Sequence, residues 1–101
     1  INCSQFEDIS KGLDTLKRCG LPYGALPNNF QSVKPLKLGM SVDNIKKRND
    51  ILIEDFVNYS NIWLKKGCTI LGGCCEITPS YINGLNQFLM KNKYNKVNFF
   101  N

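Results

Sequence analysis

The sequence predicts an α/β fold in which parallel strands alternate with helices. Three short apolar stretches suit buried strands, and each is followed by a segment whose apolar residues recur at helical spacing. The resulting order is strand end, helix, strand, helix, strand, helix, which is typical of βα units joined by right-handed crossovers. The 101 residues suffice for one small domain with a modest core.

The first unit covers about residues 1–20. A strand ends at residues 1–3, and Ser4 and Glu7 have the spacing of a capping box at the start of a helix. The apolar residues of that helix recur at helical spacing: Phe6, Ile9, Leu13 and Leu16. Gly20 offers a left-handed stop, and Cys19, in the last turn, is expected to be a small packing residue.

The second unit begins with the stretch "LPYGAL" at residues 21–26, which predicts a buried strand ending at Pro27, Asn28 and Asn29. A long connection follows, from residue 28 to about residue 52. A loop of this length is usually functional or carries a small element of its own. Residues 53–66 have apolar side chains along one helical face, so we expect a helix there.

The third unit begins with "CTIL" at residues 68–71, which predicts a buried strand with Cys68 in the core. Two glycines and two adjacent cysteines follow at residues 72–75. Thr78 as N-cap and Pro79 at the first helical position predict the start of the last helix. The polar residues 91–101 form a tail that we expect to fray.

The composition argues against several function classes. The net charge of +5 comes largely from lysines spread along the chain without interleaved aromatic residues, so a solvated surface is favoured over a nucleic-acid partner. No secretory signal is visible, and no apolar run suits a membrane span. Five cysteines, an odd number, favour a reducing, cytoplasmic setting. Because the first residue is Ile1 and not Met, we expect that a segment upstream of it has been lost.

Three of the cysteines fall at the carboxyl ends of predicted strands. Cys3 follows the first strand and Cys74 and Cys75 follow the third, so a parallel sheet brings them to one edge. The chain has no histidine, so a side-chain metal site needs thiolates, and three thiolates leave one position of a tetrahedral zinc open. The adjacent pair indicates such a site. By itself, however, Cys3 is also typical of core packing, and the two glycines before Cys74 are also typical of a turn or a phosphate-binding loop.

Several stretches resemble a known family. The segment "GGCC", followed by a short link and a proline, resembles the carboxyl-terminal zinc motif of the homocysteine S-methyltransferase family. "INCS" at residues 1–4 is similar to the family's "G-[VI]-N-C", and "ALPNNF" at residues 25–30 to its "Y-P-N-[SA]-G". Residues 36–75 follow the layout of bacterial members, with their "W-x-x-x-G-[AC]-x-I-[IL]-G-G-C-C" pattern. The resemblance extends to about residue 89.

The resemblance implies the last third of a (β/α)8 TIM barrel, from the end of strand 6 through helix 8. Residues 1–90 would be the barrel segment and residues 91–101 the polar tail. It implies a methyltransferase that binds zinc through Cys3, Cys74 and Cys75 and transfers a methyl group to the thiol of homocysteine, forming methionine. The donor would be a small molecule such as S-methylmethionine, S-adenosylmethionine or betaine, and the sequence does not choose among them.

The resemblance also implies roles for four further residues. Asn28 is expected close to the metal, where it could serve as the fourth ligand when substrate is absent. Asn2, Gly72 and Gly73 are expected to shape the substrate pocket. Because the first five strands of such a barrel are not in this chain, we expect the isolated chain to be poorly folded or inactive.

Three positions depart from the family pattern. Tyr81 stands where the family usually has histidine, and Asn29 stands where a small residue is common. The stretch "ILIED" at residues 51–55 replaces a capped helix start, so the helix that follows is expected to lack its usual cap.

Two other functions stay open from the residues alone. A structural zinc module would need a fourth protein ligand, which Cys68 or Cys19 would have to supply. A thiol redox protein would form mixed disulfides at Cys74 or Cys75 and would bind little zinc.

Overall fold

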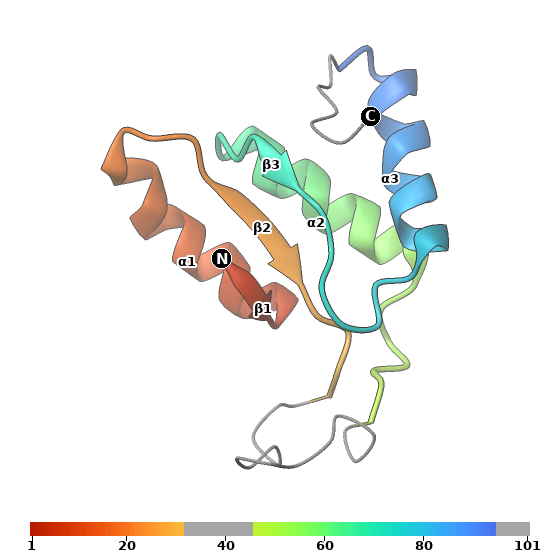
Figure 1. Ribbon diagram of the computed structural model, residues 1–101. Coiled ribbons are helices and arrows are strands. Elements are labelled where there is room, and N and C mark those ends of the chain that lie inside the picture. Colours follow the sequence, from red (N-terminus) through yellow and green to blue (C-terminus); the bar gives the residue numbers. More distant parts are fainter. Residues whose placement is uncertain (32–45, 95–101) are drawn as a thin grey trace.

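A computed structural model of the chain describes residues 1–31 and 46–94. Its elements in chain order are β1 (Asn2–Ser4), α1 (Phe6–Leu16), the 3-10 helix η1 (Lys17–Cys19), β2 (Gly24–Pro27), α2 (Ile53–Lys65), β3 (Ile70–Leu71) and α3 (Pro79–Lys91). The strands form a parallel sheet in the order β1-β2-β3 (Figure 1). The predicted alternation of parallel strands and helices is confirmed.

The helices pack on one face of the sheet, and aromatic rings fill the space between them (Figure 1). Phe6 of α1 stacks on Trp63 of α2 with ring centroids 5.9 Å apart, and Phe56 of α2 meets Tyr81 of α3 edge-on, also at 5.9 Å. The Trp63 indole N–H donates to Ser10 Oγ at 2.8 Å, so its polar atom is satisfied. Burying each ring stabilises the fold by about 1.5–3 kcal/mol.

The start of α1 differs from the prediction. Gln5, and not Ser4, is the N-cap residue, and no side chain caps the helix. Ser4 Oγ donates to the Asn2 carbonyl at 3.0 Å, while the Glu7 carboxylate pairs with Arg48 at 2.9 Å. The capping box is therefore wrong, because an ion pair with a residue 41 positions away takes the Glu7 side chain.

The turn after α1 agrees with the prediction at Gly20 but not at Cys19. Gly20 has a φ of 72°, which confirms the left-handed stop. Cys19 is exposed, so the expectation that it packs in the core is wrong: the η1 turn places it on the surface.

The strands are shorter than predicted. β2 begins at Gly24, and Leu21, expected in a buried strand, is 69% exposed. β3 comprises only Ile70 and Leu71. Cys68 is buried, as predicted, but Ile70 is half exposed because β3 lies at the edge of the sheet that the structure describes.

The last two helices begin in different ways. The backbone N–H of Leu52 donates to the Asp55 carboxylate at 2.8 Å, so α2 keeps half of the cap that the sequence was expected to lack. α3 starts as predicted, with Thr78 as N-cap and Pro79 at the first helical position. A possible element in residues 32–45 and the fraying of residues 95–101 lie outside the described residues.

The two ends of the long connection are joined at its base. Phe30 and Lys47 form an antiparallel bridge, and the Arg48 N–H donates to the Asn29 carbonyl at 2.8 Å. Residues 29–31 and 46–48 therefore run side by side just beyond the end of β2. This pairing fixes the chain on both sides of residues 32–45.

Arg48 ties this base to the start of α1. Its five N–H groups all donate: two to Glu7 at 2.9 and 3.0 Å, two to Asp50 at 2.7 and 2.9 Å, and one to Gln5 at 2.9 Å. The Arg48 side chain is only 13% exposed. Its hydrogen bonds lower the pKa of the Glu7 carboxyl and of the Asp50 carboxyl below their ordinary values.

A second set of bonds joins β2, α2 and α3. The buried Tyr81 hydroxyl donates to the Ile51 carbonyl at 2.7 Å and accepts from Asn29 Nδ2 at 3.3 Å. The ammonium of Lys47 lies 5.8 Å from the centre of the Tyr81 ring. One hydroxyl thus links the end of β2 to the approach to α2 and the start of α3.

No helix within residues 1–31 and 46–94 has the length and apolar character needed to cross a bilayer.

The Arg48 ion pairs predict an acid-dependent loss of stability. Because both carboxyl pKa values are lowered on folding, their contribution is complete above the ordinary values of 4.5 and 3.8 and is lost as the pH falls through the lower, folded-state values. Urea unfolding from about pH 6 down to about pH 3 should show a steeper loss of stability in the wild type than in Arg48→Met. The exposed Arg18→Met is the matched control. An acid dependence that is unchanged in Arg48→Met would contradict this prediction.

Removing the Tyr81 hydroxyl should destabilise the fold. Tyr81→Phe leaves buried polar groups of Asn29 and Ile51 without their best partner, at a cost of about 1–3 kcal/mol in the free energy of unfolding. Tyr94→Phe, at a residue that is 42% exposed, is the control and should change stability by less than about 0.5 kcal/mol. Equal effects in the two variants would show that the hydrogen bonds of Tyr81 contribute nothing measurable.

Candidate metal centre

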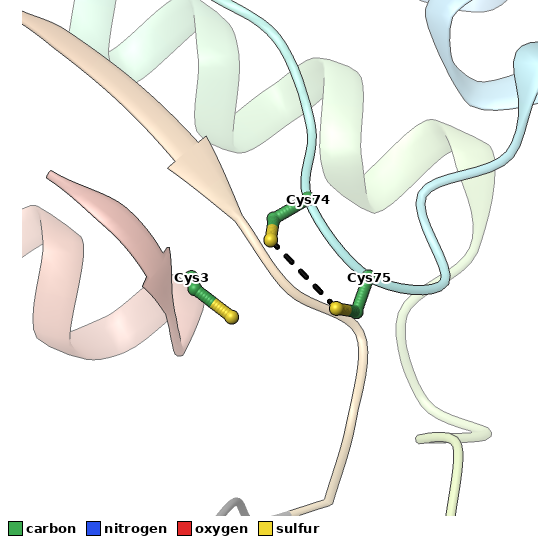
Figure 2. Close-up of side chains that lie close together, drawn as sticks. All are labelled: Cys3, Cys74 and Cys75. Carbon is green, nitrogen blue, oxygen red and sulfur yellow. Dashed lines mark hydrogen bonds between the residues drawn. The ribbon is translucent and has the colours of Figure 1, made fainter. Parts of the chain in front are cut away.

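Three thiols meet at the carboxyl edge of the sheet. Cys3 comes from β1, and Cys74 and Cys75 come from the loop after β3; their sulfur atoms point into a common space beside the end of β2 (Figure 2). The three Sγ atoms lie within 4.8 Å of one another, and those of Cys74 and Cys75 are 3.7 Å apart. Residues far apart in sequence therefore form one thiol cluster, Cys3–Cys74–Cys75.

A bulge in β1 orients Cys3. Asn2 pairs with Leu26 and Ser4 pairs with Pro27, so Cys3 is the extra residue between two consecutive partners. Its φ is 52°, in the left-handed region that non-glycine residues rarely adopt. Such bulges re-aim a side chain next to a site. The backbone of β1 is thus bent at the residue that joins the thiol cluster.

The loop that carries the other two thiols is fixed to β2. The Cys74 N–H donates to the Pro27 carbonyl at 2.8 Å, and the Cys75 carbonyl accepts from the Asn29 N–H at 2.9 Å. Glu76 then turns the chain with a φ of 62°. Two backbone bonds therefore hold the loop beside β2 at the point where both sulfur atoms face Cys3.

The two glycines before this loop allow close packing. A Cβ on Gly72 would lie 2.6 Å from Leu26 Cδ2, and one on Gly73 would collide with the side chain of Ile77. Neither glycine has a positive φ, so left-handed backbone is not the reason for glycine here. Their lack of a side chain lets the loop run close to β2 and then fold back on itself.

The thiols influence one another electrostatically. Burial and then a hydrogen bond with Cys74 raise the pKa of the Cys3 thiol. Burial, the hydrogen bond to Cys74 and the charge of Cys74 raise the pKa of Cys75 to about 11. Burial also acts to raise the pKa of Cys74, but hydrogen bonds from Cys3 and from the Cys75 backbone and side chain outweigh it, so that pKa is lowered. Of the three thiols, Cys74 therefore loses its proton most readily. A second thiolate in the same space would repel the first, and a bound cation would relieve that repulsion.

Asn28 lies beside the thiol cluster. It is 1% exposed, and its Nδ2 lies 3.8 Å from Cys3 Sγ. Its Oδ1 accepts from the Phe30 N–H at 3.1 Å and from Gln5 Nε2 at 3.4 Å. Asn2, the other polar residue expected at the pocket, is exposed in β1.

The other two cysteines lie elsewhere. Cys68 precedes β3 and Cys19 precedes β2, so both lie toward the amino ends of the strands, away from the thiol cluster. The Cys68 thiol donates to the Ile70 carbonyl at 3.3 Å. Among the described residues, no fourth cysteine and no Asp or Glu joins Cys3, Cys74 and Cys75 as a possible metal ligand.

The geometry of the thiol cluster fits zinc. Zinc–sulfur bonds of about 2.3 Å in a tetrahedron place sulfur atoms about 3.8 Å apart. The Sγ atoms of Cys74 and Cys75 are 3.7 Å apart, which matches this sulfur–sulfur distance. The Cys3 Sγ lies within 4.8 Å of both, so it would have to move by about 1 Å or less. Three soft thiolates are a donor set that selects zinc over magnesium or calcium.

Reasoning from the sequence did not single out Gln5, Arg48 or the bulge at Cys3. Arg48 stands in the basic run "KKR", which resembles an ordinary solvated surface, and Gln5 has no recognisable motif. The bulge has no glycine to mark it. Only the fold reveals that residues 5 and 48 meet beside the thiol cluster.

The chain is similar to several known methyltransferases. A selenocysteine Se-methyltransferase from Brassica oleracea var. italica is 40% identical over 81 residues, 80% of this chain and 22% of that protein. A homocysteine S-methyltransferase from Zea mays is 46% identical over 37 residues, 37% of this chain and 11% of that protein. A selenocysteine methyltransferase from Astragalus bisulcatus is 36% identical over 55 residues, 50% of this chain and 16% of that protein.

These matches span at most about a fifth of each of these three relatives, 22% in the longest case. No solved structure matches the chain. The sequence profile described as homocysteine S-methyltransferase matches residues 1–89, which include all three residues of the thiol cluster. The chain belongs to the homocysteine S-methyltransferase family.

Proposed function

We propose that this chain supplies the zinc-binding part of an enzyme that methylates the thiol of homocysteine to form methionine. The observation that carries the proposal is the convergence of Cys3, Cys74 and Cys75 in a member of this family. The overall step forms a bond between the homocysteine sulfur and the methyl carbon. It breaks the bond between that methyl group and the donor, and the thiol proton is released.

The three thiolates have the role of metal ligands. Cys3, Cys74 and Cys75 would hold zinc through their three sulfur atoms. Zinc in this place supplies a Lewis acid that lowers the pKa of a coordinated thiol. Since the chain itself contains no histidine, it offers no imidazole to act as the base.

The neighbouring residues position these ligands. The backbone bonds from Cys74 to Pro27 and from Asn29 to Cys75 fix the loop before any ligand binds. Gly72 and Gly73 let the loop that carries Cys74 pack closely against Leu26 and Ile77. Asn28, buried next to Cys3, completes the polar wall of the site.

We propose further that residues 1–90 are the last third of a (β/α)8 barrel, from the end of strand 6 through helix 8, with residues 91–101 as the tail. Three features support this arrangement. The strands follow one another in sequential order, and the helices lie on one face of the sheet. The thiol cluster lies at the carboxyl edge, where such barrels place their sites. In this proposal the rest of the barrel and the donor pocket would be supplied by residues other than these 101.

The names of the relatives leave the acceptor open between a thiol and a selenol. We propose homocysteine as the acceptor and a small methyl donor such as S-methylmethionine, S-adenosylmethionine or betaine. Selenocysteine is the competing acceptor, because two of the three relatives described above carry that name.

Substitution of the ligands should remove the metal. Cys3→Ser and Cys75→Ser in the full-length protein should retain only a small fraction of the zinc of the wild type after dialysis, since an alkoxide is not formed at neutral pH as readily as a thiolate. Cys19→Ser is the matched control and should keep its zinc, because Cys19 is exposed and lies away from the cluster. Metal loss in Cys68→Ser with retained fold would favour the structural zinc site. A mixed disulfide at Cys74 in a wild type free of zinc would favour the redox function.

Activity should require the whole enzyme. The full-length protein, given homocysteine and each methyl donor in turn, should form methionine with one donor. The isolated 101-residue chain should form none, since the three-stranded sheet in its described residues has two open edges. The assay is product formation followed by mass spectrometry. Turnover by the isolated chain comparable to that of the complete enzyme would contradict the barrel proposal. Methylation of selenocysteine in place of homocysteine would change the acceptor but not the chemistry.

A further inference from the structure

A chain of hydrogen bonds leads from Arg48 to the sulfur of Cys3. Arg48 Nη1 donates to Gln5 Oε1 at 2.9 Å, and Gln5 Nε2 donates to the Phe30 carbonyl at 2.7 Å and to Asn28 Oδ1 at 3.4 Å. Asn28 Nδ2 then lies 3.8 Å from Cys3 Sγ. Two side-chain amides thus connect a cation at the base of the long connection to the thiol cluster.

The donors in this chain fix the direction of both amides. A guanidinium only donates, so the Gln5 oxygen must face Arg48 and the Gln5 nitrogen must face Asn28. The backbone N–H of Phe30 also only donates, so the Asn28 oxygen faces Phe30 and Gln5, and the Asn28 nitrogen faces Cys3. Neither amide can turn over without placing two donors or two acceptors against each other.

This direction decides what Asn28 offers to the thiol cluster. Its oxygen, the atom that could bind a metal, is engaged by two donors and turned away from Cys3. Its nitrogen cannot bind a metal but can donate a hydrogen bond to a thiolate, and such charge-assisted bonds stabilise the anion. The polar neighbour of Cys3 therefore acts as a donor to the sulfur.

We propose that Gln5, oriented by Arg48, is a positioning residue that sets Asn28 as the N–H donor to the Cys3 thiolate. The inference rests on the proposed zinc site and goes beyond it, because neither Gln5 nor Arg48 touches the thiol cluster. The partners of metal ligands hold those ligands in the bound state, and their loss typically costs about 10–100-fold in metal affinity.

The test is Gln5→Glu in the full-length protein. A carboxylate keeps the bond to Arg48 but cannot donate, so it repels Asn28 Oδ1, and Asn28 loses one of the two donors that hold its nitrogen toward Cys3. Zinc affinity, measured by competition with a chelator, should fall about tenfold or more. Gln31→Glu is the matched control: it makes the same change of charge at an exposed residue whose amide donates to the Lys47 carbonyl, and its affinity should match the wild type.

A double-mutant cycle separates positioning from a general effect on the fold. If Gln5 acts through Asn28, the Gln5→Glu change in an Asn28→Ala background should alter zinc affinity by less than about twofold. In cobalt-substituted protein, Gln5→Glu should move the sulfur-to-cobalt charge-transfer band to lower energy, because loss of an N–H donor raises the energy of the sulfur lone pair. Gln31→Glu should leave the band in place.

Each outcome decides between the proposals. An equal loss of affinity with and without Asn28, or an equal loss in Gln31→Glu, overturns the positioning role. Unchanged affinity in Gln5→Glu, in a protein that binds zinc and methylates homocysteine, also overturns it and leaves the proposed function intact. A wild-type protein that binds no zinc overturns the proposed function itself and the positioning role with it.

Discussion

The thiol cluster depends on the backbone hydrogen bonds that β2 makes to the segments on either side of it. On one side the Leu26 N–H donates to the Ile1 carbonyl at 2.9 Å and the Asn28 N–H to the Ser4 carbonyl at 3.0 Å. On the other side the bond from Cys74 to Pro27 fixes the second thiol loop. Proline at the end of a strand loses its N–H but keeps its carbonyl, and it is this carbonyl that Cys74 uses. The last residues of β2 therefore set the distance between the two sources of thiols.

The sequence predicted the features that depend on local pattern and topology. Helical spacing predicted the helices, and Thr78 with Pro79 predicted the start of α3 to the residue. The rule that parallel strands share a carboxyl edge predicted that Cys3 would lie near Cys74 and Cys75, which the structure bears out. These predictions hold because they need only the order of elements along the chain.

Features that depend on partners distant in sequence could not be predicted in this way. The capping box of Ser4 and Glu7 is locally sound, but Arg48 offers the Glu7 carboxylate two bonds from a cation where the cap offers one bond from a neutral backbone N–H. The bulge at Cys3 has no glycine that would reveal it in the sequence. The pairing of Asn2 and Ser4 with β2 holds the strained backbone between them in place.

Two departures from the family pattern compensate for each other. Asn29 and Tyr81 are far apart in the sequence, yet Asn29 Nδ2 donates to the Tyr81 hydroxyl at 3.3 Å. A tyrosine at position 81 brings a hydroxyl into a buried place, and the amide at position 29 supplies one of its partners. The Ile51 carbonyl supplies the other. Both substitutions change the wall behind the site while the thiol cluster itself is kept.

The separation of the thiols along the chain has a consequence for biosynthesis. Residues 3 and 74 lie in the first and the last βα unit of the described chain, so the three sulfur atoms come together only after both crossovers have folded. A newly made chain exposes five separate thiols, and until folding brings three of them together each is open to oxidation or to a wrong disulfide. Correct folding is therefore expected to depend on keeping the thiols reduced until the sheet has formed.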